Sequence, residues 1–202
     1  MHTRSRFMTE NKEIVPVVIF CYNRLVTLQR LIRSLKNCSE ASDTHLIIYS
    51  DGFKNNRDKR LVNVVRKYLK TITGFKHVRI VERKCNYNIE KNITDGLNEI
   101  FRNYESAIVL EDDGEVANNF ISFMRGALKY YATDEEVMHV GTYTFLNLRL
   151  NKDEVFFWRY CENTAGGWGT WRSAWKHFAY YATWNEIEQK IPNAEKLLYE
   201  IG

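Results

Sequence analysis

Short apolar runs alternate with amphipathic segments in this chain, and that alternation limits the folds open to it. Four strand-like runs end in polar or glycine-containing turns, at residues 14–20, 46–49, 78–81 and 106–110. Apolar residues recur at helical spacing after each run, in residues 25–35, 61–72, 89–101 and 120–131. Strands joined by helices form parallel sheets with right-handed crossovers. We therefore predict an α/β fold with a Rossmann-type, mostly parallel sheet flanked by helices.

The composition of the chain becomes strongly aromatic after about residue 155. All five tryptophans lie between residues 158 and 184, in an aromatic C-terminal segment that Gly166, Gly167 and Gly169 interrupt. Residues 137–140 and 155–158 are further strand candidates. The i, i+4 spacing of Trp171 and Trp175 favours a helix whose tryptophans pack in the core or at a partner interface. We expect one domain over residues 14–202, truncated at its C-terminus, and a disordered or vector-derived segment over residues 1–13.

The composition excludes several classes of function. The 45% hydrophobic and 27% charged residues are typical of a globular protein, and no basic stripe with interleaved aromatics accompanies the net charge of +4, so nucleic acid is not an expected partner. The four cysteines, at positions 21, 38, 85 and 161, show no CxxC pair or zinc-like spacing, which favours reduced thiols in a cytoplasmic protein.

The fourth apolar run ends in Glu111-Asp112-Asp113-Gly114, the most informative junction in the chain. In an open α/β sheet, ligands bind beyond the carboxyl ends of the strands. Three neighbouring carboxylates repel one another and require a cation, and Mg²⁺-like ions bind one or two carboxylates together with phosphate and water. We therefore predict a site for a divalent cation that carries a phosphate ligand. The alternative is that the acids cap the following helix.

Polar residues also follow the first two strands. Tyr22, Asn23 and Arg24 come after the first strand and Asp51 after the second. The carboxyl ends of parallel strands share one edge of a sheet, so these side chains should lie near the acidic run. Three of them also have a plainer interpretation: Tyr22 packs, Arg24 is a solvated residue at a helix start, and Asp51 belongs to an Asp-Gly turn.

Five short motifs, in this order, resemble those of a nucleotide-sugar glycosyltransferase with the GT-A fold. They are Val18-Ile19-Phe20-Cys21-Tyr22-Asn23-Arg24, Ser50-Asp51-Gly52, Asn86-Tyr87-Asn88-Ile89, Val109-Leu110-Glu111-Asp112-Asp113 and Gly167-Trp168-Gly169-Thr170-Trp171. The likeness extends over residues 16–175. The chain is similar to bacterial sugar transferases of surface-polysaccharide clusters, and more distantly to N-acetylglucosaminyltransferase I.

The resemblance implies a role for each matching residue. Asp113 would bind the metal, Mn²⁺ or Mg²⁺, that bridges to the donor diphosphate. Asp112 would contact the ribose and Glu111 the donor sugar, and both acids would take part in catalysis. The implied nucleotide contacts come from Cys21, Tyr22, Asn23, Arg24, Asp51, Asn92 and Asp112. Asn92 stands where N-acetylglucosaminyltransferase I has a histidine, and its alternative is a solvent-facing position on a helix.

The side of the site that holds the donor and acceptor sugars would include Gly166, Gly167 and Trp168. Glycine lets backbone approach a ligand closely, and a tryptophan face stacks on a sugar ring. An inverting transfer also needs a base near the acceptor hydroxyl. The resembling family places this base well after the Gly-Gly-Trp segment, so we expect it beyond residue 202, with Glu186 and Glu188 as weaker candidates.

These observations predict a metal-dependent inverting glycosyltransferase that moves a sugar from a nucleotide-diphosphate donor, with UDP-sugar favoured, to a saccharide or lipid-linked acceptor. One alternative is a truncated or degenerate domain that binds nucleotide sugar or a partner protein without turnover. A nucleotidyltransferase is less favoured, because no glycine-rich basic loop follows the first strand. The absence of a GxxxxGK[ST] motif disfavours a P-loop kinase, and the absence of GxGxxG after the first strand disfavours a dinucleotide-binding dehydrogenase. The resemblance further implies a bacterial, cytoplasmic protein with peripheral association at the inner face of the membrane.

Overall fold

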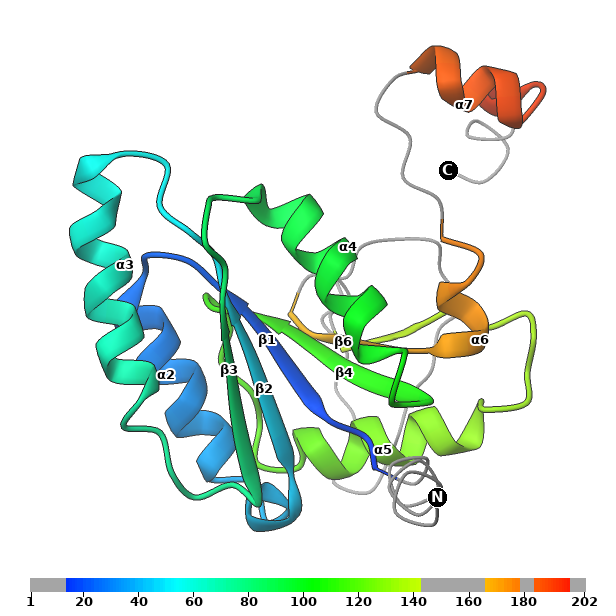
Figure 1. Cartoon of the computed structure of the whole chain (residues 1–202). Helices are drawn as coiled ribbons and strands as arrows, with labels where there is room; N and C mark the ends of the chain where they lie inside the picture. Colours follow the sequence, from blue (N-terminus) through cyan, green and yellow to red (C-terminus); the bar gives the residue numbers. More distant parts are fainter. Residues whose placement is uncertain (1–13, 143–165, 179–183, 197–202) are drawn as a thin grey trace, which may run out of the picture.

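The computed structural model describes residues 14–142, 166–178 and 184–196 and contains one six-stranded sheet flanked by helices (Figure 1). The strands are β1 Val17–Cys21, β2 His45–Ser50, β3 His77–Glu82, β4 Ser106–Glu111, β5 Val140–Gly141 and β6 Trp168–Trp171. The helices are α2 Leu25–Lys36, α3 Asn56–Leu69, α4 Asn88–Ile100, α5 Phe120–Tyr130, α6 Arg172–Trp175 and α7 Trp184–Lys190, with a short 3-10 helix at Ala41–Asp43. Residues 1–13, predicted to be disordered, and residues 197–202, before the predicted truncation, lie outside these ranges.

Four parallel strands form the main part of the sheet. The strand order is β3-β2-β1-β4-β6-β5, and β1 pairs in parallel with both β2 and β4, while β2 pairs in parallel with β3. Parallel neighbours cannot be joined by a tight turn, so helices α2, α3 and α4 connect these strands. The prediction of an α/β fold with a mostly parallel sheet is therefore confirmed.

The sheet differs from expectation beyond β4. β6 pairs antiparallel with β4, and β5 pairs antiparallel with β6. Trp171 ends β6 and Trp175 lies in the short helix α6, so the prediction of one helix carrying both tryptophans is wrong. A spacing of four residues within one turn does not separate helix from strand. Of the two further strand candidates, residues 137–140 contribute only Val140 to β5, and residues 155–158 lie outside the described residues.

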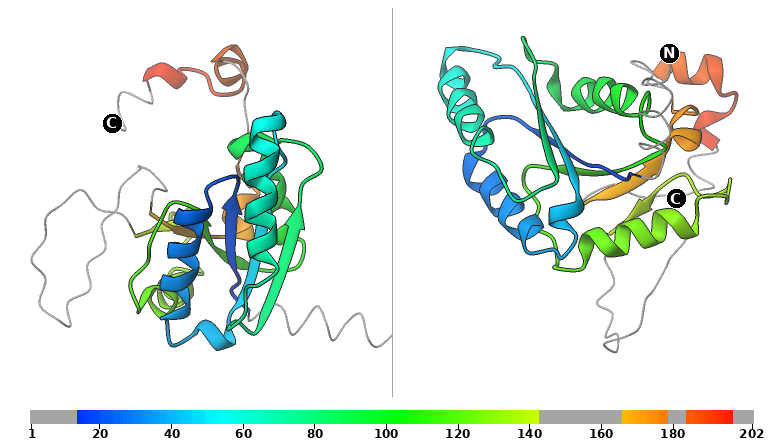
Figure 2. Two further views of the ribbon diagram at one scale, coloured as in Figure 1. Left: turned by 90° about the vertical axis from the view of Figure 1, so that its left-hand side faces the viewer. Right: turned by 60° about the horizontal axis from the view of Figure 1, so that its bottom comes forward.

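Figure 2 shows helices on both faces of the sheet, and alternation of side chains along the strands divides the core between these faces. In β1, Val17 and Ile19 pack on the side that α2, α3 and α5 cover. Val18 and Phe20 point to the opposite side, where they meet α4. Successive side chains of a strand lie on opposite faces, so a strand that is buried on both faces must be apolar throughout. That requirement explains the unbroken apolar runs in the sequence.

The apolar residues predicted on the inner face of each helix are buried or partly buried, with three exceptions. Leu61, Val64 and Ile89 were expected to be buried but are 44%, 42% and 48% exposed. Helix α3 starts at Asn56, and its buried residues are Val62, Val65 and Leu69. At the start of α4, the Asn88 Oδ1 accepts the backbone N–H of Lys91 at 3.1 Å, the bond that an N-terminal capping side chain makes. In the described part of the chain, no helix combines the length and apolarity needed to cross a membrane.

Candidate active site

The carboxyl ends of β1 and β4 lie side by side because the two strands pair in parallel. Phe20 is opposite Glu111 in the register, so the residues that follow each strand meet. Asp112 Oδ2 accepts the backbone N–H of Tyr22 at 3.1 Å. Asp112 Oδ1 accepts two further hydrogen bonds from Arg24, one of them from Nε at 2.9 Å and the other from Nη2. The structure therefore brings the predicted residues of the first and fourth strand ends into direct contact.

Arg24 is the cation nearest the acidic run. Its Nη1 donates to Asp113 Oδ2 at 2.9 Å while its other nitrogens engage Asp112. The Arg24 side chain is 49% exposed, that of Asp112 only 2% and that of Asp113 53%. Arg24 does lie half exposed at the start of α2, as its plainer interpretation expects, but its guanidinium is also paired with two acids. The acids do not cap the next helix, because α5 begins only at Phe120.

The acidic run carries more negative charge than Arg24 offsets. Burial raises the pKa of the Asp112 carboxyl, although the Tyr22 N–H and Arg24 act in the opposite direction. Desolvation, followed by repulsion from Asp113 and Asp112, raises the pKa of Glu111. Three carboxylates face one guanidinium, so an additional cation at this edge would relieve electrostatic repulsion.

Asp113 suits a divalent cation better than its neighbour does. Both oxygens of Asp112 already accept hydrogen bonds, whereas Asp113 Oδ1 accepts none within residues 14–142, 166–178 and 184–196. No three His, Cys, Asp or Glu side chains in those ranges gather into a complete metal cage. Mg²⁺-like ions need only one or two carboxylates and take their other ligands from water and substrate phosphates. The exposed Asp113 carboxylate fits such an ion.

Asp51 joins the end of β2 to the start of α4. Its Oδ1 accepts the backbone N–H groups of Gly52 and Tyr87, both at 2.8 Å, and its Oδ2 accepts Asn86 Nδ2 at 2.9 Å. A Cβ at Gly52 would lie 2.2 Å from the carbonyl carbon of Cys85, so only glycine allows the two loops to come this close. Asp51 is thus more than a local turn residue, and its contact with a nucleotide stays a prediction.

Besides the buried Asp51 and Asp112, two further predicted nucleotide-binding residues point into the protein. Cys21 is 4% exposed, lies in the core beside α2, and has its thiol pKa strongly raised by burial. Asn92 is 1% exposed, and its Oδ1 accepts Arg83 Nε at 3.1 Å, so the alternative of a solvent-facing Asn92 is wrong. The structure offers almost no surface of either side chain to a ligand. A supporting role beneath the site fits both residues better than direct contact.

Tyr22 and Asn23 connect the first loop to helix α3. The Tyr22 hydroxyl accepts the backbone N–H of Lys54 at 3.1 Å, and Asn23 Nδ2 donates to Asp58 Oδ1 at 3.4 Å. The plainer interpretation of Tyr22 as a packing residue accounts for part of its surroundings. A stacking role on a base stays a prediction.

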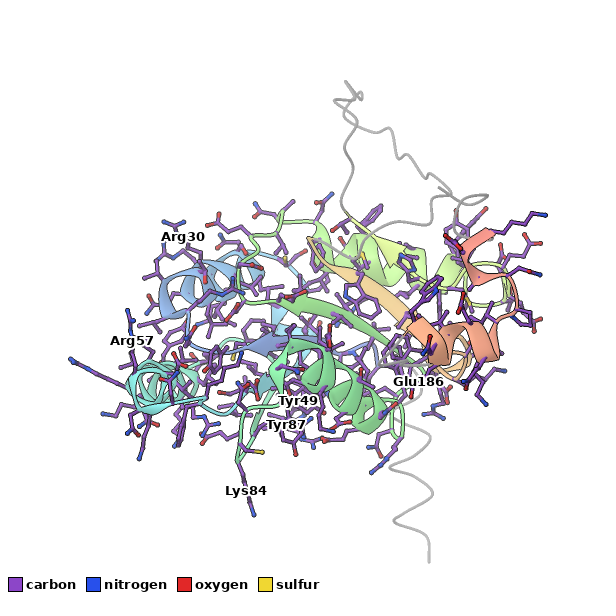
Figure 3. The ribbon with its side chains drawn as sticks, turned by 90° about the horizontal axis from the view of Figure 1, so that it is seen from above. Arg30, Tyr49, Arg57, Lys84, Tyr87 and Glu186 are labelled. Atoms are coloured by element: carbon purple, nitrogen blue, oxygen red, sulfur yellow. The ribbon has the colours of Figure 1, made fainter. Side chains whose placement is uncertain are left out.

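Arg66 and Arg83, which belong to none of the five motifs, form hydrogen bonds and ion pairs around the ends of β2 and β3. Arg66 Nη2 donates to three carbonyl oxygens there, at distances of 2.8–3.3 Å. Arg83 Nη1 pairs with Glu99 at 2.6 Å, and its guanidinium lies over the rings of Tyr49 and Tyr87, which Figure 3 labels. In the sequence, Arg66 is only a cation beside the buried stripe of a helix and Arg83 only a cation after a strand, and both patterns are usually solvent-facing.

Strand β6 brings the glycine–tryptophan segment next to the acidic run. Trp168 pairs with β4, and Gly167, with φ of 111°, is so close that a Cβ would lie 2.8 Å from Leu110 Cδ2. The Thr142 hydroxyl lies 3.0 Å from the carbonyl oxygen of Gly166 and 3.1 Å from that of Gly167, and it can donate to either. The Gly166-Gly167-Trp168 segment, which we expect to contact the sugars, therefore lies beside Leu110, the residue that precedes Glu111.

The sheet topology and its acidic edge define a GT-A-like domain. Residues 2–160 match the model of the GNT-I family, and since this match covers most of the chain, the protein belongs to that family of glycosyltransferases. The resemblance derived from the five motifs is thereby confirmed at the level of family and fold.

Three solved structures illustrate the range of similar folds. TarS from S. aureus matches with 13% identity and a TM-score of 0.44, over 59% of this chain and 20% of that one. The mannosyltransferase PcManGT from Pyrobaculum calidifontis, in complex with GDP-Man and Mn²⁺, matches with 14% identity and a TM-score of 0.42, over 68% and 40%. The 4-diphosphocytidyl-2C-methyl-D-erythritol synthase from Anaerococcus prevotii matches with 10% identity and a TM-score of 0.47, over 91% and 84%. The chain spans less than half the length of the first two proteins.

Proposed function

We propose that the protein is a metal-dependent, inverting glycosyltransferase that takes a sugar from a nucleotide-diphosphate donor, with UDP-sugar favoured. Its acceptor would be a saccharide or a lipid-linked saccharide, met in the cytoplasm. The observation that carries this proposal is the contrast between adjacent aspartates at the end of β4. Asp112 is buried and fully hydrogen-bonded, whereas Asp113 is exposed, in a chain that belongs to the GNT-I family.

Four residues at the ends of β1 and β4 would each have a different role in donor binding. Asp113 would hold the cation, Mn²⁺ or Mg²⁺, which when bound supplies positive charge for the departing diphosphate. Asp112 holds the loop after β1 through the Tyr22 N–H and Arg24 and so preserves the shape of the site. The half-exposed Arg24 can also offset phosphate charge. Glu111 lies at the exposed end of β4, where we place the donor sugar.

Replacing Asp113 tests the metal assignment. Asp113→Asn should abolish the Mn²⁺-dependent part of nucleotide affinity and weaken binding by at least about tenfold, because loss of even an outer partner of a metal ligand typically costs that much. Isothermal titration calorimetry with UDP, GDP and dTDP, with and without Mn²⁺, measures this effect. Glu115→Gln removes an equally exposed acid two residues further on and should leave binding unchanged.

Two results would overturn the proposal. Asp113→Asn binding as tightly as the parent would contradict the metal site, and no binding of any nucleotide would contradict the donor site. Donor binding without hydrolysis or transfer would support the alternative of a nucleotide-sugar-binding domain without turnover. The anomeric configuration of a transfer product, read by NMR, decides between inversion and retention.

A further inference from the structure

Positive charge is concentrated in helix α3 and the loop before it. Residues 53–70 contain seven lysines and arginines and one acid, a net charge of +6, whereas the whole chain has a net charge of +4. The rest of the chain is therefore slightly acidic. A local concentration of this kind produces a strong field over one surface that the overall composition conceals.

The acid and two of the cations in this segment are engaged within the protein. Asp58 accepts Asn55 Nδ2 at 2.9 Å and also contacts Asn23. Arg66 and Lys70 both pair with Glu82, at 3.4 and 3.8 Å. The cations left on the exposed surface of the segment are Lys54, Arg57, Lys59, Arg60 and Lys67.

Two exposed aliphatic side chains lie among these cations. Arg57, Leu61 and Val64 follow one another at i, i+4 and i+7, and therefore form one stripe along α3. Leu61 is 44% and Val64 42% exposed, and their stripe lies about a quarter-turn around the helix from the buried Val62, Val65 and Leu69. Arg60 and Lys67 lie beside this stripe and, with Val64, line an open depression on the surface. We call this set of residues the α3 outer face.

The α3 outer face lies at one end of the molecule, beside the candidate active site. Figure 1 shows α3 as the outermost helix on its side, opposite α5 and α6, and Figure 3 shows Arg57 projecting away from the sheet. The start of α3 contacts the loop after β1 through the Asn23–Asp58 hydrogen bond. A surface bound to this face would therefore lie near the edge at which we place the donor.

We propose that the α3 outer face docks onto an anionic lipid membrane. Its cations would contact lipid phosphates while Leu61 and Val64 enter the headgroup region, as in amphipathic basic helices that lie in the membrane plane. Nucleic acid would be attracted by the cations, but the exposed aromatic ring of the segment, Phe53, already has the Lys59 ammonium 5.4 Å from its centroid and is a poor platform for base stacking. If the α3 outer face also brings a lipid-linked acceptor to the site, that role rests on the proposed function. Membrane binding by this face does not.

Vesicle binding of the full chain tests the proposal. We expect the parent to co-sediment with vesicles in which about a third of the lipid is phosphatidylglycerol, and not with pure phosphatidylcholine vesicles. The triple variant Arg57→Gln, Arg60→Gln, Lys67→Gln should lower the partition coefficient by about a hundredfold, given the usual contribution of each cation near an anionic surface. Leu61→Ser with Val64→Ser should lower it by about tenfold without changing the charge.

The matched control removes the same charge at the other end of the molecule. Arg102→Gln, Lys129→Gln, Lys176→Gln changes exposed cations near the ends of α4, α5 and α6 and should leave binding within about threefold of the parent. Equal losses in both triple variants, no vesicle binding by the parent, or a stronger preference for a DNA duplex would each overturn the proposal. Circular dichroism establishes that the variants are folded. Unchanged nucleotide binding by the Arg57 triple variant separates this test from that of the proposed function.

Discussion

At the scale of single residues, adjacent carboxylates have different surroundings. Asp112 accepts hydrogen bonds from the Tyr22 N–H and from Arg24. Asp113 faces outward and accepts a hydrogen bond from Arg24 through only one of its oxygens. Both residues lie in the turn that follows β4, where the backbone changes direction, so neighbours in sequence need not share an environment. A metal ligand and a structural carboxylate can therefore stand side by side in one acidic run.

Glu111→Gln should stabilise the protein at neutral pH. Desolvation and the neighbouring Asp113 and Asp112 raise the pKa of Glu111 in the folded state, so the folded state holds this proton more tightly than the unfolded chain does. The parent therefore loses stability as pH rises from the ordinary glutamate pKa of about 4.3 through the folded value. Glutamine does not titrate, so the advantage of the variant should grow over this rise to about 0.5 kcal/mol, a modest amount because the side chain is exposed.

Urea unfolding of parent and variant at several pH values measures this difference. Glu188→Gln, which removes one exposed carboxylate of α7, serves as the control for the loss of a negative charge. A difference between Glu111→Gln and the parent that is constant from acid to neutral pH would contradict the argument.

At the scale of elements, a glycine sets the distance between α4 and the sheet. A Cβ at Gly96 would lie 2.5 Å from Cε1 of Phe20 and 3.4 Å from Cδ2 of Tyr49. The Tyr49 hydroxyl donates to the Gly96 carbonyl at 3.2 Å, and the Phe20 and Tyr49 rings stack at 5.2 Å. This close approach fixes α4 over the strand ends, so that Tyr87, before its first turn, reaches Asp51.

Two helical glycines should respond to alanine with opposite signs. Gly96→Ala should lower the free energy of unfolding by about 1–3 kcal/mol, because the added methyl overpacks the contact with Phe20. Gly126→Ala in α5, where a Cβ would meet nothing within 4 Å, should raise it by about 0.5–1 kcal/mol through helix propensity. Chemical denaturation of both variants gives the two values. A stable Gly96→Ala protein would show that α4 can shift away from the sheet at little cost.

At the scale of the whole molecule, the segment that follows residue 165 completes the sheet. β6 lies between β4 and β5, and its Trp171 Nε1 donates to the Leu128 carbonyl of α5 at 3.0 Å. The Thr170 hydroxyl donates to the Met138 carbonyl at 2.7 Å. These bonds connect parts of the chain that are 32–43 residues apart. The sheet is therefore a single structure to which the aromatic segment contributes.

Trp171→Phe should destabilise the whole sheet. Phenylalanine keeps most of the apolar contact but leaves the buried Leu128 carbonyl without the indole donor, which should cost about 1–3 kcal/mol. Trp184→Phe, an exposed position on α7, should change stability by less than about 0.5 kcal/mol. Urea unfolding followed by far-UV circular dichroism measures both. Equal stability of the two variants would contradict the idea that Trp171 joins β6 to α5.

The sequence by itself determined the parallel part of the sheet, the helices between its strands and the edge at which the acids gather. Those features depend on local periodicity and on the common direction of parallel strands. Only the tertiary structure decided that Arg24 pairs with Asp112, that Asp51 joins two loops, that the glycine–tryptophan segment is a strand, and that Leu61 and Val64 face outward. These outcomes depend on which distant segments become neighbours, and residues 88 positions apart carry no local pattern that pairs them.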